Sequence, residues 1–288
     1  MGSSSDTGDG GGVLTLAAVP IGRADDASAR LVAELARASL IAAEDTRRVR
    51  WLASSLNIEL SARIVSYYDA VEARRTPGLL SELQAGQDVL LVTDAGTPGI
   101  SDPGYRLVAA AAAAGIRITA LPGPSAVTTA LAVSGLPTDR FSFEGFPPRR
   151  PGERQRRFAE LASDHRTQVY FESGRRLAST LSELAASHGE DRQAVVCREL
   201  TKTHEEIRRG TAGGERLRRL ANGIGGHRDI AAGTASVRSA EPVSVPGPGG
   251  VRGPDGVTGP GGARGAGRPA AAAADPGDHE RDLPADGG

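Results

Sequence analysis

Residues 88–104, D-V-L-L-V-T-D-A-G-T-P-G-I-S-D-P-G, decide the fold that the sequence predicts. Within this stretch, Val89–Val92 is an unbroken aliphatic run between polar neighbours, which is typical of a strand buried on both faces of a parallel sheet. A loop rich in glycine and proline follows, and Tyr105–Ala114 then has the alanine-rich composition of a helix. A buried strand, a loop and a helix in this order place the loop at the carboxyl edge of an open α/β sheet, where such folds bind their ligands.

The loop after Val92 carries groups that suit a polar ligand. Asp94 and Asp102 offer carboxylates, Thr97 and Ser101 offer hydroxyls, and three glycines let the backbone approach a ligand closely. The loop lacks the lysine of a P-loop, and its carboxylates would repel an anion. A neutral or cationic ligand therefore fits better than a phosphate, and an ordinary structural turn is the alternative interpretation.

Composition limits the class of protein. The chain has 288 residues, a net charge of -1 and one cysteine, Cys197, so we expect one or two domains, no intramolecular disulfide and a reducing cytoplasm. Residues 1–12 are small and polar, and we expect them to be disordered. No apolar run approaches the roughly 20 residues of a membrane span, and the histidines show no metal-ligand spacing. We therefore expect a soluble protein with no membrane partner and no metal.

Residues 13–121 alternate strand and helix patterns, which predicts a domain built on a doubly wound parallel sheet. We expect strands at Val13–Val19, Leu40–Ala43, Ile64–Ser66, Val89–Val92 and Ile116–Ala120. Helices are expected at Ser28–Ala38, from Glu44–Arg47 onward, around Leu79–Leu83 and at Tyr105–Ala114. Thr76-Pro77 is expected to start the third of these helices afresh, because proline disrupts a helix interior.

A second α/β domain with a more mixed sheet is expected at residues 122–211, after the turn at Leu121–Ser125. Ser125 can cap a helix that ends near Ser134. Further along, strands are expected at Phe141–Phe143, Val169–Phe171 and Ala194–Cys197, with an amphipathic helix at Leu177–Ala186. Residues 212–288 hold half of the 38 glycines and no aromatic residue, so we expect a low-complexity, disordered tail with a helical patch at Arg216–Ala221.

A series of short motifs carries a resemblance to a known family. The motifs are Pro20–Gly22, Ala42–Arg47, Val92–Pro98, Ser101–Tyr105, Leu121–Ala126, Gly135–Pro137, Phe143–Phe146, Phe171–Ser173 and Arg198–Lys202. In this order they resemble the ribosomal RNA small-subunit methyltransferase I family, which belongs to the tetrapyrrole-methylase fold group. The resemblance implies the two-domain α/β fold of class III methyltransferases.

The same resemblance implies a function and a cofactor. Members of the family 2′-O-methylate a cytidine of 16S rRNA in the 30S subunit, use S-adenosylmethionine held between two α/β domains, and usually form homodimers. The cofactor is a cation without phosphate, as the loop chemistry favours. By position, the residues expected to contact it are Pro20, Gly22, Asp94, Ala95, Gly96, Thr97, Pro98, Ser101, Ser125, Ala126 and Leu200.

A base for the ribose hydroxyl is sought among ionisable residues at the ends of predicted strands. The candidates are Glu44, Asp45, Glu199 and Lys202. For the first two, a structural role at a helix N-terminus is the alternative. RNA phosphates are expected to meet Arg47, Arg149, Arg150, Arg154, Arg156, Arg157 and Arg198, for which salt bridges or a solvated loop are the alternatives.

The resemblance fails after Thr211. The family continues there with a helix, a Gly-Glu pair and an aliphatic strand, whereas this chain enters its low-complexity segment. We therefore expect the second domain to be incomplete, and to have an open sheet edge if the following hypothesis holds. We hypothesise that the reading frame shifts near residue 212, since a GC-rich gene read out of frame yields Gly, Pro, Arg and Ala; sequencing the gene tests this.

Two other functions stay open at this point. One is methylation of a tetrapyrrole, although those enzymes usually carry a Gly-x-Gly-x-Gly-Asp run after the first strand and this chain has only Gly22 there. The other is an RNA-binding protein that has lost catalysis, for which the expected absence of a strand would be the cause. Binding of S-adenosylmethionine separates the second from both enzymes.

Overall fold

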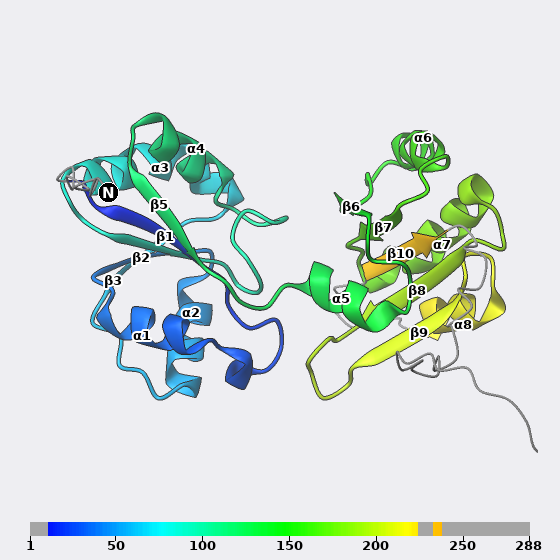
Figure 1. Cartoon of the computed structure of the whole chain (residues 1–288), viewed down its shortest axis with the longest axis horizontal. Helices are drawn as coiled ribbons and strands as arrows, with labels where there is room; N and C mark the ends of the chain where they lie inside the picture. Colours follow the sequence, from blue (N-terminus) through cyan, green and yellow to red (C-terminus); the bar gives the residue numbers. More distant parts are fainter. Residues whose placement is uncertain (1–10, 224–232, 238–288) are drawn as a thin grey trace, which may run out of the picture. The chain divides into compact units, whose positions relative to one another are not determined.

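The computed structural model describes residues 11–223 and 233–237 (Figure 1). The expected disordered N-terminus, except for Gly11 and Gly12, and the expected tail at 224–232 and 238–288 lie outside the described residues. Within the described ranges, none of the helices combines the length and the apolar character that a membrane span requires.

Five parallel strands form the first sheet, in the order β3-β2-β4-β1-β5. They are β1 (Val13–Ala17), β2 (Leu40–Ala43), β3 (Arg63–Ser66), β4 (Val89–Val92) and β5 (Arg117–Leu121). The register places Leu16 of β1 beside Leu91 of β4 and Ala120 of β5. The predicted doubly wound parallel sheet is confirmed, with strand ends that differ from the expected ones by no more than about two residues.

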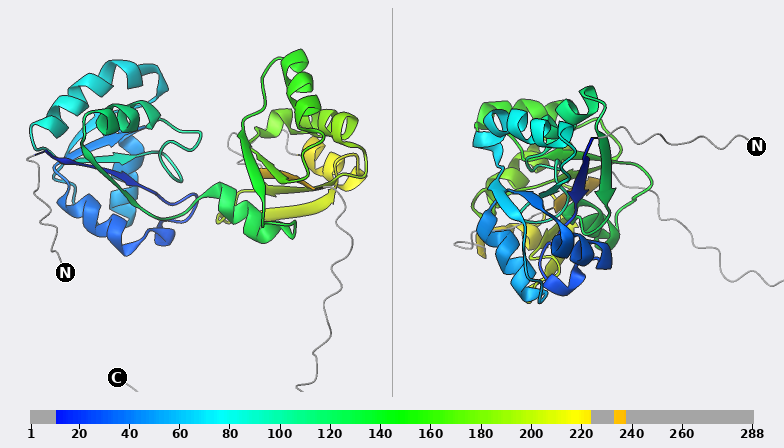
Figure 2. Two further views of the ribbon diagram at one scale, coloured as in Figure 1. Left: turned by 45° about the horizontal axis from the view of Figure 1, so that its top comes forward. Right: turned by 90° about the vertical axis from the view of Figure 1, so that its left-hand side faces the viewer.

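Helices cover both faces of this sheet (Figures 1 and 2). A short 3-10 helix (Ala24–Asp26) precedes α1, and the helices are α1 (Ala29–Arg37), α2 (Thr46–Ser55), α3 (Asp69–Gln84) and α4 (Tyr105–Ala113). Leu90 and Val92 of β4 pack with α1 and α2 on one face, while Val89 and Leu91 pack with α3 and α4 on the other. Because side chains of a strand alternate between faces, an aliphatic run is needed where both faces are buried.

Helix α3 corrects the expectation at Pro77. The helix runs from Asp69 to Gln84 without a restart, although proline cannot donate a hydrogen bond to the preceding turn. The hydroxyl of Thr76 donates to the carbonyl of Glu72 at 2.9 Å, and buried residues on both sides of the proline, Val71 and Leu79, keep the helix against the sheet. Tertiary packing therefore outweighs the local preference of proline. As a result, the residues before Pro77, Glu72 among them, belong to the helix.

The second sheet has the order β6-β7-β10-β8-β9 and mixes parallel and antiparallel pairs, as predicted. Its strands are β6 (Phe141–Gly145), β7 (Thr167–Tyr170), β8 (Gln193–Arg198), β9 (Glu206–Thr211) and β10 (Gly233–Val237). The helices of this part are α5 (Ala126–Ser134), α6 (Pro151–Leu161), α7 (Gly174–His188) and α8 (Glu215–Gly223). Phe158, Tyr170, Leu181, Val196 and Leu217 bring α6, β7, α7, β8 and α8 into one apolar core.

The expected gap in the second sheet is filled. Strand β10 lies between β7 and β8, and Thr234 is opposite both Tyr170 and Val196. The expectation of a missing strand with an open edge was wrong because ladder hydrogen bonds come from the backbone, so G-T-A-S-V can pair without an aliphatic run. The predicted helical patch after Thr211 is confirmed by α8, whose Leu217 and Ala221 are buried in the core.

Candidate active site

The loops that follow β1, β4 and β5 meet at the carboxyl edge of the first sheet. Val19 N–H donates to the carbonyl of Gly96 at 2.8 Å, and Gly96 N–H donates back at 3.1 Å. The hydroxyl of Thr97 lies 3.5 Å from the carbonyl of Pro124. The structure thus brings together the segments that contain most of the predicted cofactor-binding residues, namely Pro20, Gly22, Asp94, Ala95, Gly96, Thr97, Pro98, Ser101, Ser125 and Ala126.

The loop after β4 has a fixed shape of its own. Ile100 N–H donates to Thr97 O at 3.2 Å, and Gly99 N–H donates to Pro103 O at 3.2 Å. Ser101 has a φ of 64°, a left-handed conformation that costs a non-glycine residue free energy. Gly104 has a φ of 142°, and a Cβ there would lie 3.2 Å from a methyl group of Leu91, so this position requires glycine.

Glu72 of α3 fastens the end of that loop. Its Oε1 accepts hydrogen bonds from Gly104 N–H at 3.0 Å, from Arg106 N–H at 3.1 Å and from the Tyr67 hydroxyl at 3.2 Å. The carboxylate is buried and lies at the start of α4, where free N–H groups and the helix dipole favour an anion. Sequence analysis missed Glu72, although it shares the helix face of Leu79 and Leu83 once the helix is continued through Pro77.

Two carboxylates join the ends of neighbouring strands. Glu44 follows β2, and its Oε2 accepts the N–H of Asp94 at 3.0 Å. Asp94 follows β4, and its Oδ1 accepts the N–H of Asp45 at 3.1 Å. The guanidinium of Arg48 lies 3.8 Å from Asp94. Each carboxylate therefore has a backbone partner on the neighbouring strand, and the two strand ends hold each other in place.

The electrostatics of this edge favour protonated carboxyls or a bound cation. Burial raises the pKa of Glu44 and of Asp94, and this effect outweighs the lowering by Arg48 and by the backbone N–H group that each carboxylate accepts. Burial, followed by repulsion from Glu44, Asp94 and Asp69, raises the pKa of Asp102 to about 7. A cation placed among these groups would stabilise their charged forms. Even so, none of the described residues forms a group of three or more side chains that could hold a metal ion.

Asp45 differs from its neighbours. It is the N-cap of α2, accepting the N–H of Arg47 at 2.8 Å, and its carboxylate also pairs with the Arg47 guanidinium at 2.6 Å. These hydrogen bonds from Arg47 lower the pKa of Asp45 to about 2. A carboxylate that is so weakly basic is a poor proton acceptor near neutral pH. The geometry favours the alternative interpretation of a helix cap, in which Arg47 is a salt-bridge partner.

The turn after β8 contains the other two predicted ionisable residues. Lys202 Nζ lies 3.3 Å from Glu199 Oε2, so each is the other's partner. Glu199 and Thr201 have φ values of 51° and 64°. A Cβ on Gly22 would lie 2.4 Å from the Thr201 hydroxyl oxygen, so only glycine allows this turn to pack against the loop after β1. Such strained positions gather where a site needs a defined backbone.

Leu200, the remaining predicted cofactor-binding residue, lies in that turn. Its side chain is buried and packs with Leu136 and Cys197, and Ile21 packs against the same cluster. It therefore joins the loop after β1 to the second sheet, and the structure gives it apolar side chains as neighbours.

The predicted RNA-binding arginines fall into three groups. Arg154 is buried and forms a two-pronged ion pair with Glu183 of α7, so its prediction as an RNA contact was wrong. The reason is helical periodicity, which places Arg154 on the inner face of α6 with Phe158 and Leu161.

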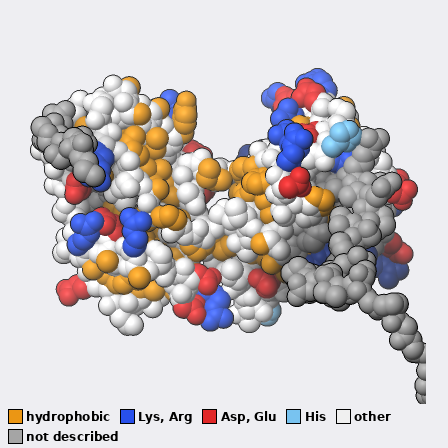
Figure 3. Space-filling view, in the orientation of Figure 1, with side chains coloured by type: hydrophobic (Ala, Val, Ile, Leu, Met, Phe, Trp, Pro, Cys, Tyr) orange, Lys and Arg blue, Asp and Glu red, His pale blue; other side chains and the backbone are white. Residues whose placement is uncertain are grey.

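Four of the other arginines pair with carboxylates, among them Arg47, whose partner is Asp45. Arg157 lies 2.7 Å from Glu144, Arg150 lies 3.3 Å from Glu153, and the half-buried Arg198 lies 3.5 Å from Glu206. Arg149 and Arg156 are exposed, and within the described part of the chain their side chains have no ion pair. Figure 3 shows Lys and Arg side chains gathered with acidic ones over α6.

Comparison with known proteins decides between the alternatives for the fold and the family. The profile of the tetrapyrrole (corrin/porphyrin) methylases matches residues 13–214. Ribosomal RNA small subunit methyltransferase I of Mycobacterium tuberculosis (strain CDC 1551 / Oshkosh) is 56% identical over 200 residues, which cover 69% of this chain and 70% of that protein. The chain belongs to the ribosomal RNA small subunit methyltransferase I family.

Solved structures of tetrapyrrole methylases share the fold of this family member. The methyltransferase CobJ superposes with a TM-score of 0.59 at 20% identity, covering 80% of this chain and 95% of that one. Uroporphyrin-III C-methyl transferase of Thermus thermophilus, complexed with S-adenyl homocysteine, superposes with a TM-score of 0.54 at 18% identity, covering 79% and 97%. The predicted class III methyltransferase fold is confirmed. The family profile ends at Gly214, close to the residue at which we hypothesise a shift of reading frame.

Proposed function

We propose that this chain transfers a methyl group from S-adenosylmethionine to the ribose 2′-hydroxyl of a cytidine in 16S rRNA of the small ribosomal subunit. Family membership supports a methyltransferase acting on ribosomal RNA. The observation that carries the proposal within the structure is the meeting of the loops after β1 and β4 beside an excess of carboxylates. A sulfonium compound that also bears an amine, and no phosphate, matches that charge.

The residues present fit such a cofactor. Asp94 offers a carboxylate beside Gly96, whose φ of 72° favours glycine, and Gly22 leaves no room for a side chain. We propose that the loops containing these residues, together with Ser125 and Ala126, hold the cofactor, which when bound supplies an electrophilic methyl group. Much of the acceleration would come from holding the hydroxyl oxygen in line with that methyl group.

Glu44 is the base that the geometry supports best among the four predicted candidates. It is half-buried, its backbone partner is Asp94, and burial raises its pKa toward the range useful for general base catalysis. In this role it would take the proton of the 2′-hydroxyl as the oxygen–carbon bond forms and the bond between that carbon and the sulfur breaks, with the electron pair going to the sulfur. Asp45 is bound to Arg47, and Glu199 and Lys202 are bound to each other.

The substrate surface is proposed to include the exposed arginines of the α6 region, namely Arg149, Arg150, Arg156 and Arg157, together with Arg47 and Arg198. Their charges suit a phosphate backbone although the net charge of the chain is -1. We further propose that the protein works as a homodimer on 30S subunits in the cytoplasm. The alternative of an RNA-binding homologue without catalysis rested on a missing strand. It is not favoured, because β10 lies within the second sheet.

The test is methyl transfer into purified 30S subunits that lack the modification. The protein is incubated with S-adenosylmethionine and subunits, and the rRNA is digested and analysed by nucleoside mass spectrometry. We expect 2′-O-methylcytidine, reduced at least tenfold by Glu44→Gln. A methylated product at a base, or transfer only to an added tetrapyrrole, would overturn the proposal.

A further inference from the structure

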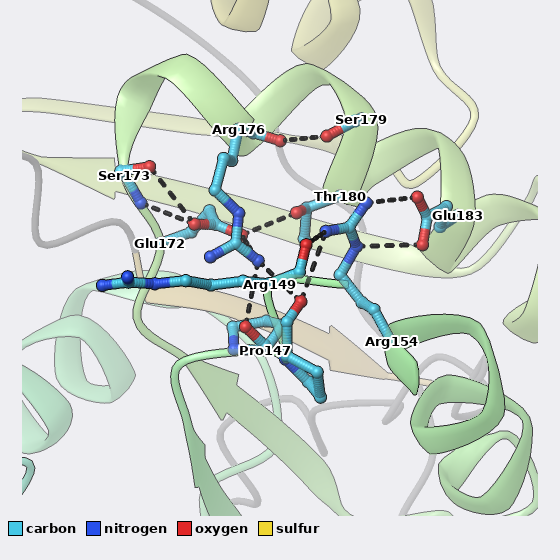
Figure 4. Close-up of polar contacts among 10 residues, drawn as sticks. Pro147, Arg149, Arg154, Glu172, Ser173, Arg176, Ser179, Thr180 and Glu183 are labelled. Atoms are coloured by element: carbon cyan, nitrogen blue, oxygen red, sulfur yellow. Dashed lines mark hydrogen bonds and ion pairs between the residues drawn. The ribbon is translucent and has the colours of Figure 1, made fainter. Parts of the chain in front are cut away.

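A buried carboxylate anchors a polar network in the second domain (Figure 4). Glu172 follows β7 and is fully buried. Its carboxylate accepts hydrogen bonds from Ser173 N–H at 2.7 Å and from the Thr180 hydroxyl at 2.6 Å, and it lies 3.4 Å from the guanidinium of Arg176. A buried charge is tolerated only with such partners. Glu172 therefore fixes Arg176 at the start of α7.

Two arginines use this support to hold the backbone between β6 and α6. Arg176 donates to the carbonyls of Pro147 and Pro148 at 2.9 and 3.0 Å. Arg154, whose charge is balanced by Glu183, lies 3.3 and 3.4 Å from the carbonyls of Pro148 and Arg149. Three successive carbonyls are thus held by two guanidinium groups, which is more than a solvated connection between a strand and a helix requires.

The outward side of this segment is left to side chains. Pro147 and Pro148 have no N–H groups, and their carbonyls are occupied by the arginines. Figure 4 shows the Arg149 side chain extending away from the network. Arg149 and the exposed Arg156 of α6 have no ion pair among the described residues, so neither must leave a carboxylate in order to meet a phosphate.

We propose that Arg154 and Arg176, each with its carboxylate partner, are positioning residues that present Arg149 and Arg156 to the phosphate backbone of the RNA substrate. The inference rests on the proposed function. Arg149 and Arg156 would touch the RNA, whereas Arg154 and Arg176 would act only by holding the backbone that carries them. A purely structural network that staples α6 to α7 is the competing explanation.

The test measures the affinity of the full chain for 30S subunits lacking the methylation, by filter binding at several KCl concentrations and fixed magnesium. Arg149→Ala with Arg156→Ala should weaken binding about tenfold and make the slope of log affinity against log salt shallower by about 1.5. Arg176→Lys keeps the charge but not the fork, and should weaken binding and reduce the slope in the same direction. When Arg176→Lys is added to the double variant, neither the affinity nor the salt slope should change further.

Arg209→Lys is the matched control, because Arg209 also donates to two backbone carbonyls of the same domain, those of Val133 and Ser134. It should leave affinity and salt slope unchanged at a similar loss of thermal stability. If Arg176→Lys destabilises the domain too far, Thr180→Val replaces it, with Thr167→Val as its control, since both remove a hydroxyl hydrogen bond from a buried threonine.

Two results would overturn the inference. One is a double variant that binds as the wild type does; the other is an Arg176→Lys variant, or Thr180→Val in its place, that changes only stability, as its control does. Methyl transfer by the wild type is measured alongside. If the wild type transfers no methyl group, the proposed function fails. If the wild type transfers it normally and the variants bind RNA unchanged, only the positioning role is wrong.

Discussion

Two regions of this protein differ in whether their acidic side chains are paired with basic ones. At the carboxyl edge of the first sheet, burial raises the pKa values of Glu44, Asp94 and Asp102, and repulsion from the other two raises that of Asp102 further. Between α6 and α7, Glu172 and Glu183 are each bound by an arginine. The difference supports the proposal that the first region binds a ligand and indicates that the second holds the fold together. We call them the ligand region and the scaffold region.

The largest effect is expected from removing β10, which tests whether the second sheet needs this strand. A chain that ends at Ala232 lacks the strand between β7 and β8, whereas a chain that ends at Val237 keeps it. The shorter chain should lose the cooperative unfolding of the second domain, a loss on the order of 5–15 kcal/mol. Urea unfolding followed by circular dichroism measures this. Identical curves for the two chains would show that β10 contributes nothing.

The next effect compares a buried arginine with an exposed one in the scaffold region. Arg154→Ala leaves the carboxylate of Glu183 without its partner and should cost about 3–5 kcal/mol. Arg150→Ala removes an exposed pair with Glu153 and should cost no more than about 1 kcal/mol. Free energies of unfolding from urea titration decide. Equal losses would mean that burial does not distinguish these two arginines.

A smaller effect is expected from Glu72, which supports the loop of the ligand region. Glu72→Ala leaves the N–H groups of Gly104 and Arg106 without an acceptor and should cost about 2 kcal/mol. Glu72→Gln keeps an acceptor oxygen and should cost less. The control is Glu82→Ala on the same helix, which removes a more exposed pair with Arg63 and should cost under about 1 kcal/mol. A loss from Glu72→Ala no larger than that of the control would contradict the capping role.

The pH dependence of stability tests the uncompensated charge directly. Because the pKa of Asp102 is raised from 3.8 to about 7, the folded protein keeps a proton that the unfolded chain releases between these values. Stability should therefore fall as the pH rises through this window, by about 2 kcal/mol after allowance for the solvent that reaches this half-buried carboxyl. Asp102→Asn should remove that part of the decline. Parallel profiles for wild type and variant, measured by urea unfolding from pH 5 to 8, would contradict it.

Much of the ligand region could be predicted from sequence because its signals are local. The aliphatic run Val89–Val92 and the glycine-proline loop after it specify a buried strand and a shaped turn by themselves. Glu72 was missed because Pro77 led us to predict that the helix starts afresh there, so the residues before it were not assigned to α3. The N–H groups that donate to its carboxylate, at Gly104 and Arg106, are more than thirty residues away, and only the folded chain brings them together.

The scaffold region was harder to predict because its signals are tertiary. Arg154 belongs to a run of arginines that suggests a surface, and only the periodicity of α6 turns it inward against Glu183. Strand β10 reads G-T-A-S-V, in which small apolar and polar residues alternate over only five positions and no aliphatic run is present. So weak a signal inside a glycine-rich segment was missed, and the place of the strand in the sheet depends on partners far along the chain.

The most direct test of the ligand region is the binding of labelled S-adenosylmethionine by equilibrium dialysis to the wild type, Asp94→Asn and Asp88→Asn. Both aspartates accept a backbone N–H, from Asp45 and Val13 respectively, but Asp88 lies at the opposite edge of the same sheet. An asparagine oxygen can still accept that hydrogen bond, so only the charge is lost. We expect Asp94→Asn to weaken binding on the order of 10- to 100-fold and Asp88→Asn to leave it unchanged. Equal affinities for the two variants would contradict a cofactor site at the carboxyl edge.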